Sequence, residues 1–142
     1  LPSHLNPGIW CIKGDLTTNT EGAGVLIVLL DGGVKYTGNG DLRLTRADDM
    51  KDKNGRQWGG MVIYAPTTNT NTFKFGGNSK GLFNGTVYAP GMDCDFGGTP
   101  DNKSNHTSMI GYTVKIHGNP IVDITYDPDQ NFHFSSGLEL SQ

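Results

Sequence analysis

The stretch Val34-Lys35-Tyr36 and the turn Gly38-Asn39-Gly40 that follows it decide the fold of this chain. The reason is that their pattern occurs three times in the sequence. Each copy has an apolar residue, a lysine and a second apolar residue before a turn rich in Gly and Asn. The other two copies are Phe73-Lys74-Phe75 with Gly76-Gly77-Asn78, and Val114-Lys115-Ile116 with Gly118-Asn119-Pro120. The copies begin 39 and 41 residues apart. Alternation places the lysines on one face of each predicted strand and the apolar residues on the other. We expect Phe73/Phe75 and Val114/Ile116 to form internal ladders, with the lysines on the outer face.

A second pattern, Ile63-Tyr64-Ala65-Pro66, returns 24 residues later as Val87-Tyr88-Ala89-Pro90. Strand patterns that return at about 20 residues, or at a multiple of that distance, are typical of solenoids, in which equivalent residues of successive coils stack on one another. We therefore predict an all-β chain that forms a right-handed parallel β-helix, as a single domain over residues 1–142. A β-sandwich is the alternative, because it also consists of short strands with regular turns.

The composition favours short strands joined by turns. Glycine accounts for 21 of the 142 residues and the hydrophobic fraction is 35%, which suits turns better than helices. The charged segment 46–53 lacks an apolar stripe and is predicted to be a loop. Strands are predicted at Gly8–Lys13, Val25–Leu30, Val34–Thr37, Asp41–Thr45, Met61–Ala65, Thr72–Phe75, Leu82–Ala89, Met92–Phe96, Met109–His117 and Ile121–Tyr126.

Charge and hydropathy exclude two classes of partner. The net charge is −3 and no basic stripe is present, so we expect no nucleic acid partner. The longest apolar run, Val25–Leu30, is too short to span a bilayer. The sequence starts at Leu1-Pro2, and we expect a mature or excised part of a longer precursor.

Few residues point to chemistry. Asp93 and Asp95 lie on one face of a predicted strand, where polysaccharide-cleaving β-helices place carboxylates, but a glycosidase needs two carboxyl groups that straddle one bond. The histidines and acidic residues have no metal-ligand spacing. We therefore expect no catalytic residue, no metal, no cofactor and no enzyme activity.

Cysteines and sequons leave alternatives open. Cys11 and Cys94 are the two cysteines, and they form either a disulfide or two buried thiols. Asn-x-Ser/Thr triplets at Asn84, Asn102 and Asn105 are candidate glycosylation sites.

Two polar insertions, 45–58 and 99–107, interrupt the repeat and are predicted to be loops at a corner of the coil. Insertions of this kind often carry binding in repeat proteins. The candidate partner-binding residues in them are Asp48, Asp49, Arg56, Trp58, Asp101, Lys103 and His106.

Five segments carry a resemblance to a bacterial family: Pro7–Asp15, Asp31–Val34, Gly59–Tyr64, Gly85–Pro90 and Met109–Gly118. In this order they resemble the Gly/Asn-rich region of TadG-like (Tad/Flp) pilus-assembly proteins, over roughly residues 5–140. The resemblance implies a β-helical domain of the bacterial envelope, extracellular or at the cell surface. It implies no catalytic residues.

We accordingly expect a non-enzymatic structural protein that acts in pilus assembly or adhesion, and whose partners are itself or other pilus and envelope proteins. Open strand edges at the ends of a solenoid favour a self-stacking filament subunit. The alternative is a carbohydrate-binding or polysaccharide-cleaving β-helix, in which Trp10, Trp58, Tyr64 and Tyr88 form a platform for surface glycans.

Overall fold

The computed structural model describes residues 1–97, 101–104, 107–118 and 121–124, and within them every regular element is a β-strand. No helix in this part of the chain is long and apolar enough to cross a membrane. The strands are β1 (His4–Leu5), β2 (Gly8–Lys13), β3 (Thr20–Ala23), β4 (Val25–Asp31), β5 (Val34–Tyr36), β6 (Asp41–Thr45), β7 (Met61–Tyr64), β8 (Thr72–Phe75), β9 (Lys80–Phe96), β10 (Asp101–Ser104), β11 (Thr107–Ile116) and β12 (Ile121–Ile124).

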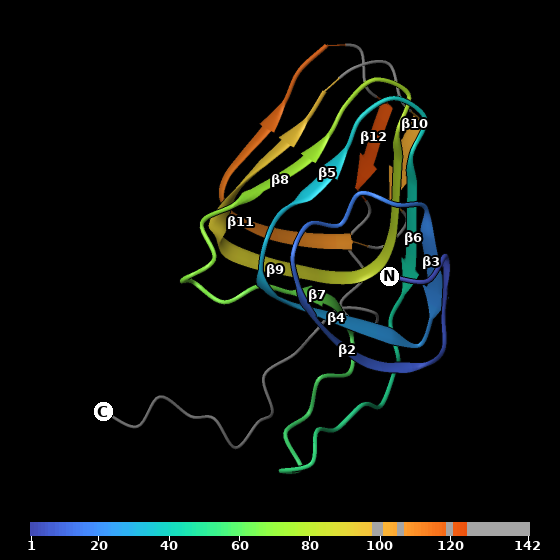
Figure 1. Ribbon diagram of the computed structural model, residues 1–142, viewed down its shortest axis with the longest axis vertical. Coiled ribbons are helices and arrows are strands. Elements are labelled where there is room, and N and C mark those ends of the chain that lie inside the picture. Colours follow the sequence, from blue (N-terminus) through green and yellow to red (C-terminus); the bar gives the residue numbers. More distant parts are fainter. Residues whose placement is uncertain (98–100, 105–106, 119–120, 125–142) are drawn as a thin grey trace.

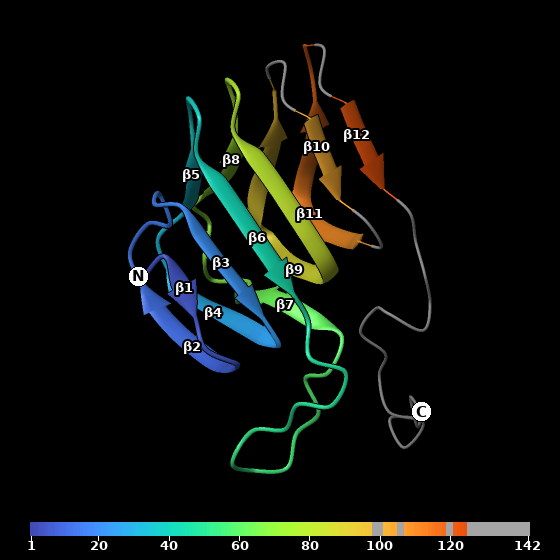
Figure 2. The ribbon, with the colours of Figure 1, turned by 90° about the vertical axis from the view of Figure 1, so that its right-hand side faces the viewer.

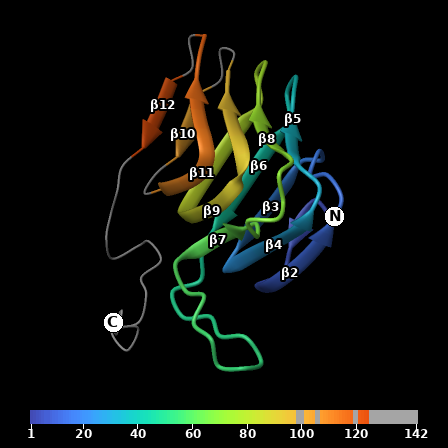
Figure 3. The same cartoon turned by 90° about the vertical axis from the view of Figure 1, so that its left-hand side faces the viewer.

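The strands stack in parallel on three sides of one core (Figure 1). Side one holds β1, β3, β6 and the start of β9, which lie next to one another in Figure 2. Side two holds β2, β4, β7, the middle of β9 and the start of β11. Side three holds β5, β8 and the ends of β9 and β11 (Figure 3). The pairs between described strands are parallel, so the antiparallel β-sandwich is wrong and a curled, solenoid-like stack is confirmed.

The strand register places the three copies of the repeated pattern on side three. Val34 pairs with Phe73 and Lys35 with Lys74. Phe73 in turn pairs with Cys94 of β9, which pairs with Val114. The two copies of the second pattern also pair with each other, because Ile63-Tyr64 of β7 lies in register with Val87-Tyr88 of β9. Equivalent sequence positions therefore occupy equivalent places in successive coils.

Aromatic rings form a ladder inside side three. Phe75 is fully buried and stacks on Tyr36, with ring centroids 5.1 Å apart, and on Phe96 at 5.8 Å. The Tyr36 hydroxyl donates a hydrogen bond to the Thr18 carbonyl at 2.5 Å, and burial raises the pKa of Tyr36 to about 12. Stacked rings add contact energy to the burial of their apolar surface.

The last strand of this side departs from the expected internal ladder. Val114 and Ile116 follow Cys94 and Phe96 in register, yet they remain 48% and 52% exposed. The expectation of internal ladders is therefore confirmed for Phe73 and Phe75, which are buried, and is wrong for this later pair.

Glycine is required where the turns of successive coils meet. Gly32 has a φ of +91°, and a Cβ atom there would lie 2.3 Å from the backbone of Gly14. Gly77 has a φ of +66°, and its Cβ atom would lie 2.8 Å from the Gly38 nitrogen. A side chain would therefore meet both an unfavourable backbone conformation and a steric clash.

One predicted loop is wrong. The insertion at 99–107 contains the strand β10, which pairs in parallel with β12. The sequence of β10, Asp-Asn-Lys-Ser, has no apolar residue and therefore gives no strand signal. In the structure, β10 lies against β9 and belongs to the coil that follows it. The strands β1 and β3 were also not predicted, because β1 has only two residues and β3, Thr-Glu-Gly-Ala, has no large apolar residue.

Candidate functional site

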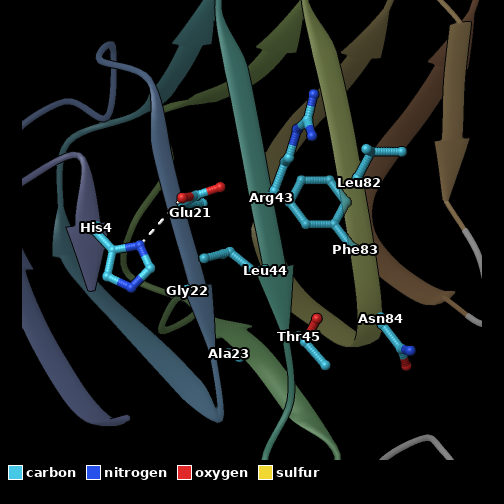
Figure 4. A pocket seen from close by; sticks show the side chains of 10 residues that line it. All are labelled: His4, Glu21, Gly22, Ala23, Arg43, Leu44, Thr45, Leu82, Phe83 and Asn84. Atoms are coloured by element: carbon cyan, nitrogen blue, oxygen red, sulfur yellow. Dashed lines mark hydrogen bonds and ion pairs between the residues drawn. The ribbon is translucent and has the colours of Figure 1, made fainter. Parts of the chain in front are cut away.

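A shallow depression of about 460 Å³ lies on the outer face of side one. His4, Glu21, Arg43 and Leu82 pair in sequence across β1, β3, β6 and β9. Alternation along each strand turns these four side chains away from the core. Thr45 and Asn84 lie at the lower end of the depression in Figure 4.

The charged groups of the depression are largely solvated and paired. His4 Nδ1 lies 3.2 Å from a carboxylate oxygen of Glu21, and both side chains are more than half exposed. Arg43 contacts Asp41 of its own strand at 3.1 Å. The lining, which includes the hydroxyl of Thr45 and the amide of Asn84, offers hydrogen-bonding groups. Exposed pairs of this kind contribute little to stability.

The first insertion is a loop, as predicted, and it projects from the stack between β6 and β7 (Figures 2 and 3). Asp52 organises its far end. One carboxylate oxygen accepts hydrogen bonds from the backbone N–H groups of Asn54 (2.8 Å) and Arg56 (3.0 Å). The other accepts one from the Trp58 indole at 3.2 Å. These bonds, the one from Trp58 most of all, lower the pKa of Asp52, because they favour the ionised form.

Gln57 organises the near part of this loop. Its side-chain oxygen lies 3.1 Å from each of three backbone nitrogens, those of Met50, Trp58 and Gly59. Its amide nitrogen donates to Asp49 at 3.0 Å, and the backbones of Lys51 and Gln57 form an antiparallel bridge. Residues 50–57 are therefore a hairpin that is held by its own side chains.

The base of the loop is fixed to the coils. Arg46 donates to the Asn84 side chain at 2.6 Å and pairs with Asp48 at 2.9 Å. The Trp58 ring packs edge to face with Tyr64 of β7, with centroids 5.2 Å apart. The Arg56 guanidinium lies 5.8 Å from the centroid of the Trp58 ring. The loop is thus joined to side one and to side two.

The two predicted groups of binding residues have different settings. Asp48, Asp49, Arg56 and Trp58 all lie in this loop. Arg56 contacts Trp58, whereas Asp48 pairs with Arg46 and Asp49 accepts a hydrogen bond from Gln57. Asp101 and Lys103 lie on the strand β10 instead of in a loop, and His106 lies outside the described residues. The sequence did not single out Asp52 and Gln57 for binding, although the Asp-x-x-Gly pattern of Asp52 and Gly55 is a turn signal that marks the hairpin.

The predicted carboxylate pair on side three is held by partners from other coils. Asp93 accepts a hydrogen bond from the Thr113 hydroxyl at 2.6 Å. Asp95 lies 3.9 Å from the Lys74 ammonium and 2.5 Å from His117 Nε2. The contact with His117 comes from the strand register, because β11 brings His117 beside β9. These contacts connect successive coils.

The aromatic residues proposed as a sugar platform mostly pack on one another. Tyr64 and Tyr88 stack with an interplanar angle of 3° and centroids 5.7 Å apart, so each ring turns one face toward the other. Trp58 packs on Tyr64, and the Trp10 indole donates to the Asn6 carbonyl at 2.9 Å. Sugars stack on open ring faces, so this arrangement does not favour a platform.

Both cysteines are free, so the alternative of a disulfide is wrong, and of the two thiols that the other alternative expected to be buried only Cys94 is buried. Cys94 points into the core, and burial raises the pKa of its thiol to about 11. Cys11 is exposed on the outer face of side two, where it pairs in register with Val28. The two cysteines lie on different sides of the stack and on opposite faces of their strands.

The candidate glycosylation sites fall in three places. Asn84 lies at the boundary of side one, where its side-chain oxygen accepts the bond from Arg46. Asn102 lies on β10, and Asn105 lies outside the described residues. Among the residues that the structure describes, no group of three or more His, Cys, Asp or Glu side chains could hold a metal ion.

In the part of the chain that the structure describes, these features define an all-β architecture of stacked parallel coils from which a hairpin projects. Residues 10–131 match a family model described as a domain of unknown function, DUF7305. The chain therefore belongs to the DUF7305 family. No curated protein and no solved structure matches it.

Proposed function

We propose that this chain is a right-handed parallel β-helix that acts as a non-enzymatic structural domain of a bacterial surface appendage, in pilus assembly or adhesion. The observation that carries the proposal is the continuous register of equivalent residues from coil to coil on side three. A stack of this kind makes an elongated spacer, in which each coil supports its neighbours.

Contacts between coils on the outer surface support a structural role. Lys35 pairs with Asp15 of the preceding coil at 2.8 Å, and Lys74 and Asp95 connect the next two coils. A domain that transmits force or keeps two partners apart needs such lateral connections. The resemblance to TadG-like proteins supports the assignment to pilus assembly and to the cell surface.

Self-stacking through strand edges is the form of assembly that we propose. In the described part of the chain, β2 pairs with β4 alone, and Ile9 on β2 is 38% exposed. An unpaired parallel edge with exposed apolar side chains is a template for strand addition by a second copy. Addition at one end of a stack is head-to-tail, and it produces filaments when the rotation does not close.

Electron microscopy and light scattering of the purified chain test this proposal. We expect regular fibres that are prevented by Ile9→Lys, which places a charge on the edge strand. Leu30→Lys is the matched control, because Leu30 is similarly exposed (42%) but lies on β4, which has neighbours on both sides. A monodisperse monomer at high concentration would contradict self-stacking. Resistance of the chain to protease added to intact host cells would contradict its exposure at the cell surface.

A further inference from the structure

The hairpin of residues 50–57 has the properties of a binding element. It projects away from the stack in two perpendicular views (Figures 1 and 2), so a large partner can reach it. The side chains of Asp52 and Gln57 together accept six hydrogen bonds inside the loop and from Trp58. A loop held in one shape loses less conformational entropy on binding than a mobile loop does.

The exposed charges at the tip are positive. Lys51, Lys53 and Arg56 occupy six consecutive positions together with Asp52, Asn54 and Gly55, and all three cations are exposed. The carboxylate of Asp52 accepts hydrogen bonds from the loop backbone and the Trp58 indole, and it also interacts electrostatically with Arg56. Within the described residues, the lysines of the tip make no ion pair, whereas Lys35, Arg43, Arg46 and Lys74 are each paired with an aspartate.

These cations stand out because the chain as a whole carries a net charge of −3. A local positive tip on an acidic protein attracts anions at that point and repels them elsewhere. The tip, Lys51-Asp52-Lys53-Asn54-Gly55-Arg56, has no apolar residue to insert into a bilayer. Three cations are also too few for the basic stripe that binds nucleic acid.

We propose that this hairpin is a docking site for an acidic polysaccharide, in which Lys51, Lys53 and Arg56 contact carboxylates of successive sugar residues. Each exposed contact contributes about two- to fivefold to the affinity, so binding depends on several cations at once. The interaction weakens steeply with salt, because solvent-exposed charges are screened. The site is independent of the strand edges that carry the proposed self-assembly.

Binding of the full chain to polygalacturonate tests the proposal, by calorimetry at low salt. We expect binding that Lys51→Ser with Lys53→Ser weakens by about tenfold. The matched control is Lys13→Ser with Lys115→Ser, which removes the same charge from two exposed lysines of β2 and β11 and should change the affinity less than twofold. A neutral galactan should not bind.

A second variant tests the shape of the loop separately from its charge. Gln57→Ala leaves the net charge unchanged and removes the acceptor of three backbone bonds. We expect the affinity for polygalacturonate to fall by about two- to fivefold, with an unchanged melting temperature of the stack.

Three results would overturn the proposal. The first is no binding of polygalacturonate by the wild-type chain, and the second is equal weakening by the tip variant and its control. The third is binding to vesicles of anionic phospholipid without binding to the polysaccharide, which would assign the tip to a membrane surface. A chain that binds the polysaccharide but stays monomeric would contradict self-stacking alone.

Discussion

Replacement of Phe75 tests whether the aromatic ladder holds the coils together. Phe75 is 0% exposed, stacks on Tyr36 and Phe96, and also contacts the rings of Phe73 and Phe83. Truncation of a buried phenylalanine to alanine costs about 3–5 kcal/mol. We expect Phe75→Ala to lie in the upper half of this range, because four rings lose a partner.

Phe75→Leu separates ring stacking from apolar burial. Leucine keeps most of the buried volume, and the loss of two stacked pairs at about 0.5–1.5 kcal/mol each predicts a cost of about 1–3 kcal/mol. The control is Tyr112→Ala at a side chain that is 75% exposed, where we expect a change within about 0.5 kcal/mol. Urea denaturation measures all three, with an unchanged dependence on denaturant as the check on cooperativity. A cost below about 2 kcal/mol for Phe75→Ala, or equal costs for alanine and leucine, would refute the reasoning.

Three further predictions concern thiols, pH and turns. At pH 8, a thiol reagent should modify the exposed Cys11 rapidly and the buried Cys94, with its raised pKa, only after unfolding; two fast thiols would show that the core is open. Because the pKa of Asp52 is lowered in the folded chain, its hydrogen bonds stabilise the hairpin fully at pH values above the ordinary pKa of 3.8. This stabilisation is lost as the pH falls through the lowered pKa, and faster hydrogen exchange in the loop should detect the loss. Gly32→Ala should destabilise the chain at least twice as much as Gly55→Ala in thermal unfolding, because both positions have positive φ but only the first lacks space for a Cβ atom; equal effects would mean that the turns can move apart.

The fold could be predicted wherever the strands carry apolar alternation. Gly8–Lys13, Asp41–Thr45 and Thr72–Phe75 were predicted with the bounds that the structure has. β10 could not be predicted, because Asp-Asn-Lys-Ser has no apolar residue. It forms a strand through pairing with β12, which is a nonlocal contact.

The sequence predicts which residues belong to the candidate sites, but it does not predict which of them contact one another. An interruption of the repeat marks the first insertion as a loop, and its charges are visible in the sequence. The convergence of Gln57 on three backbone nitrogens depends on the hairpin bending back on itself. The contact of His117 with Asp95 depends on the register between coils, which a single strand cannot reveal.

The sequence by itself determined the repeated strand unit, the glycine turns and the outward lysines, because alternation and φ preferences act within a few residues. The tertiary structure alone decided which aspartate faces which lysine, that Cys11 and Cys94 stay apart, and that the rings of Tyr36, Phe75 and Phe96 form one ladder. The physical reason is that parallel strands from different coils meet only when loops of unequal length bring them into register. Coil length, set by the whole chain, therefore fixes these contacts.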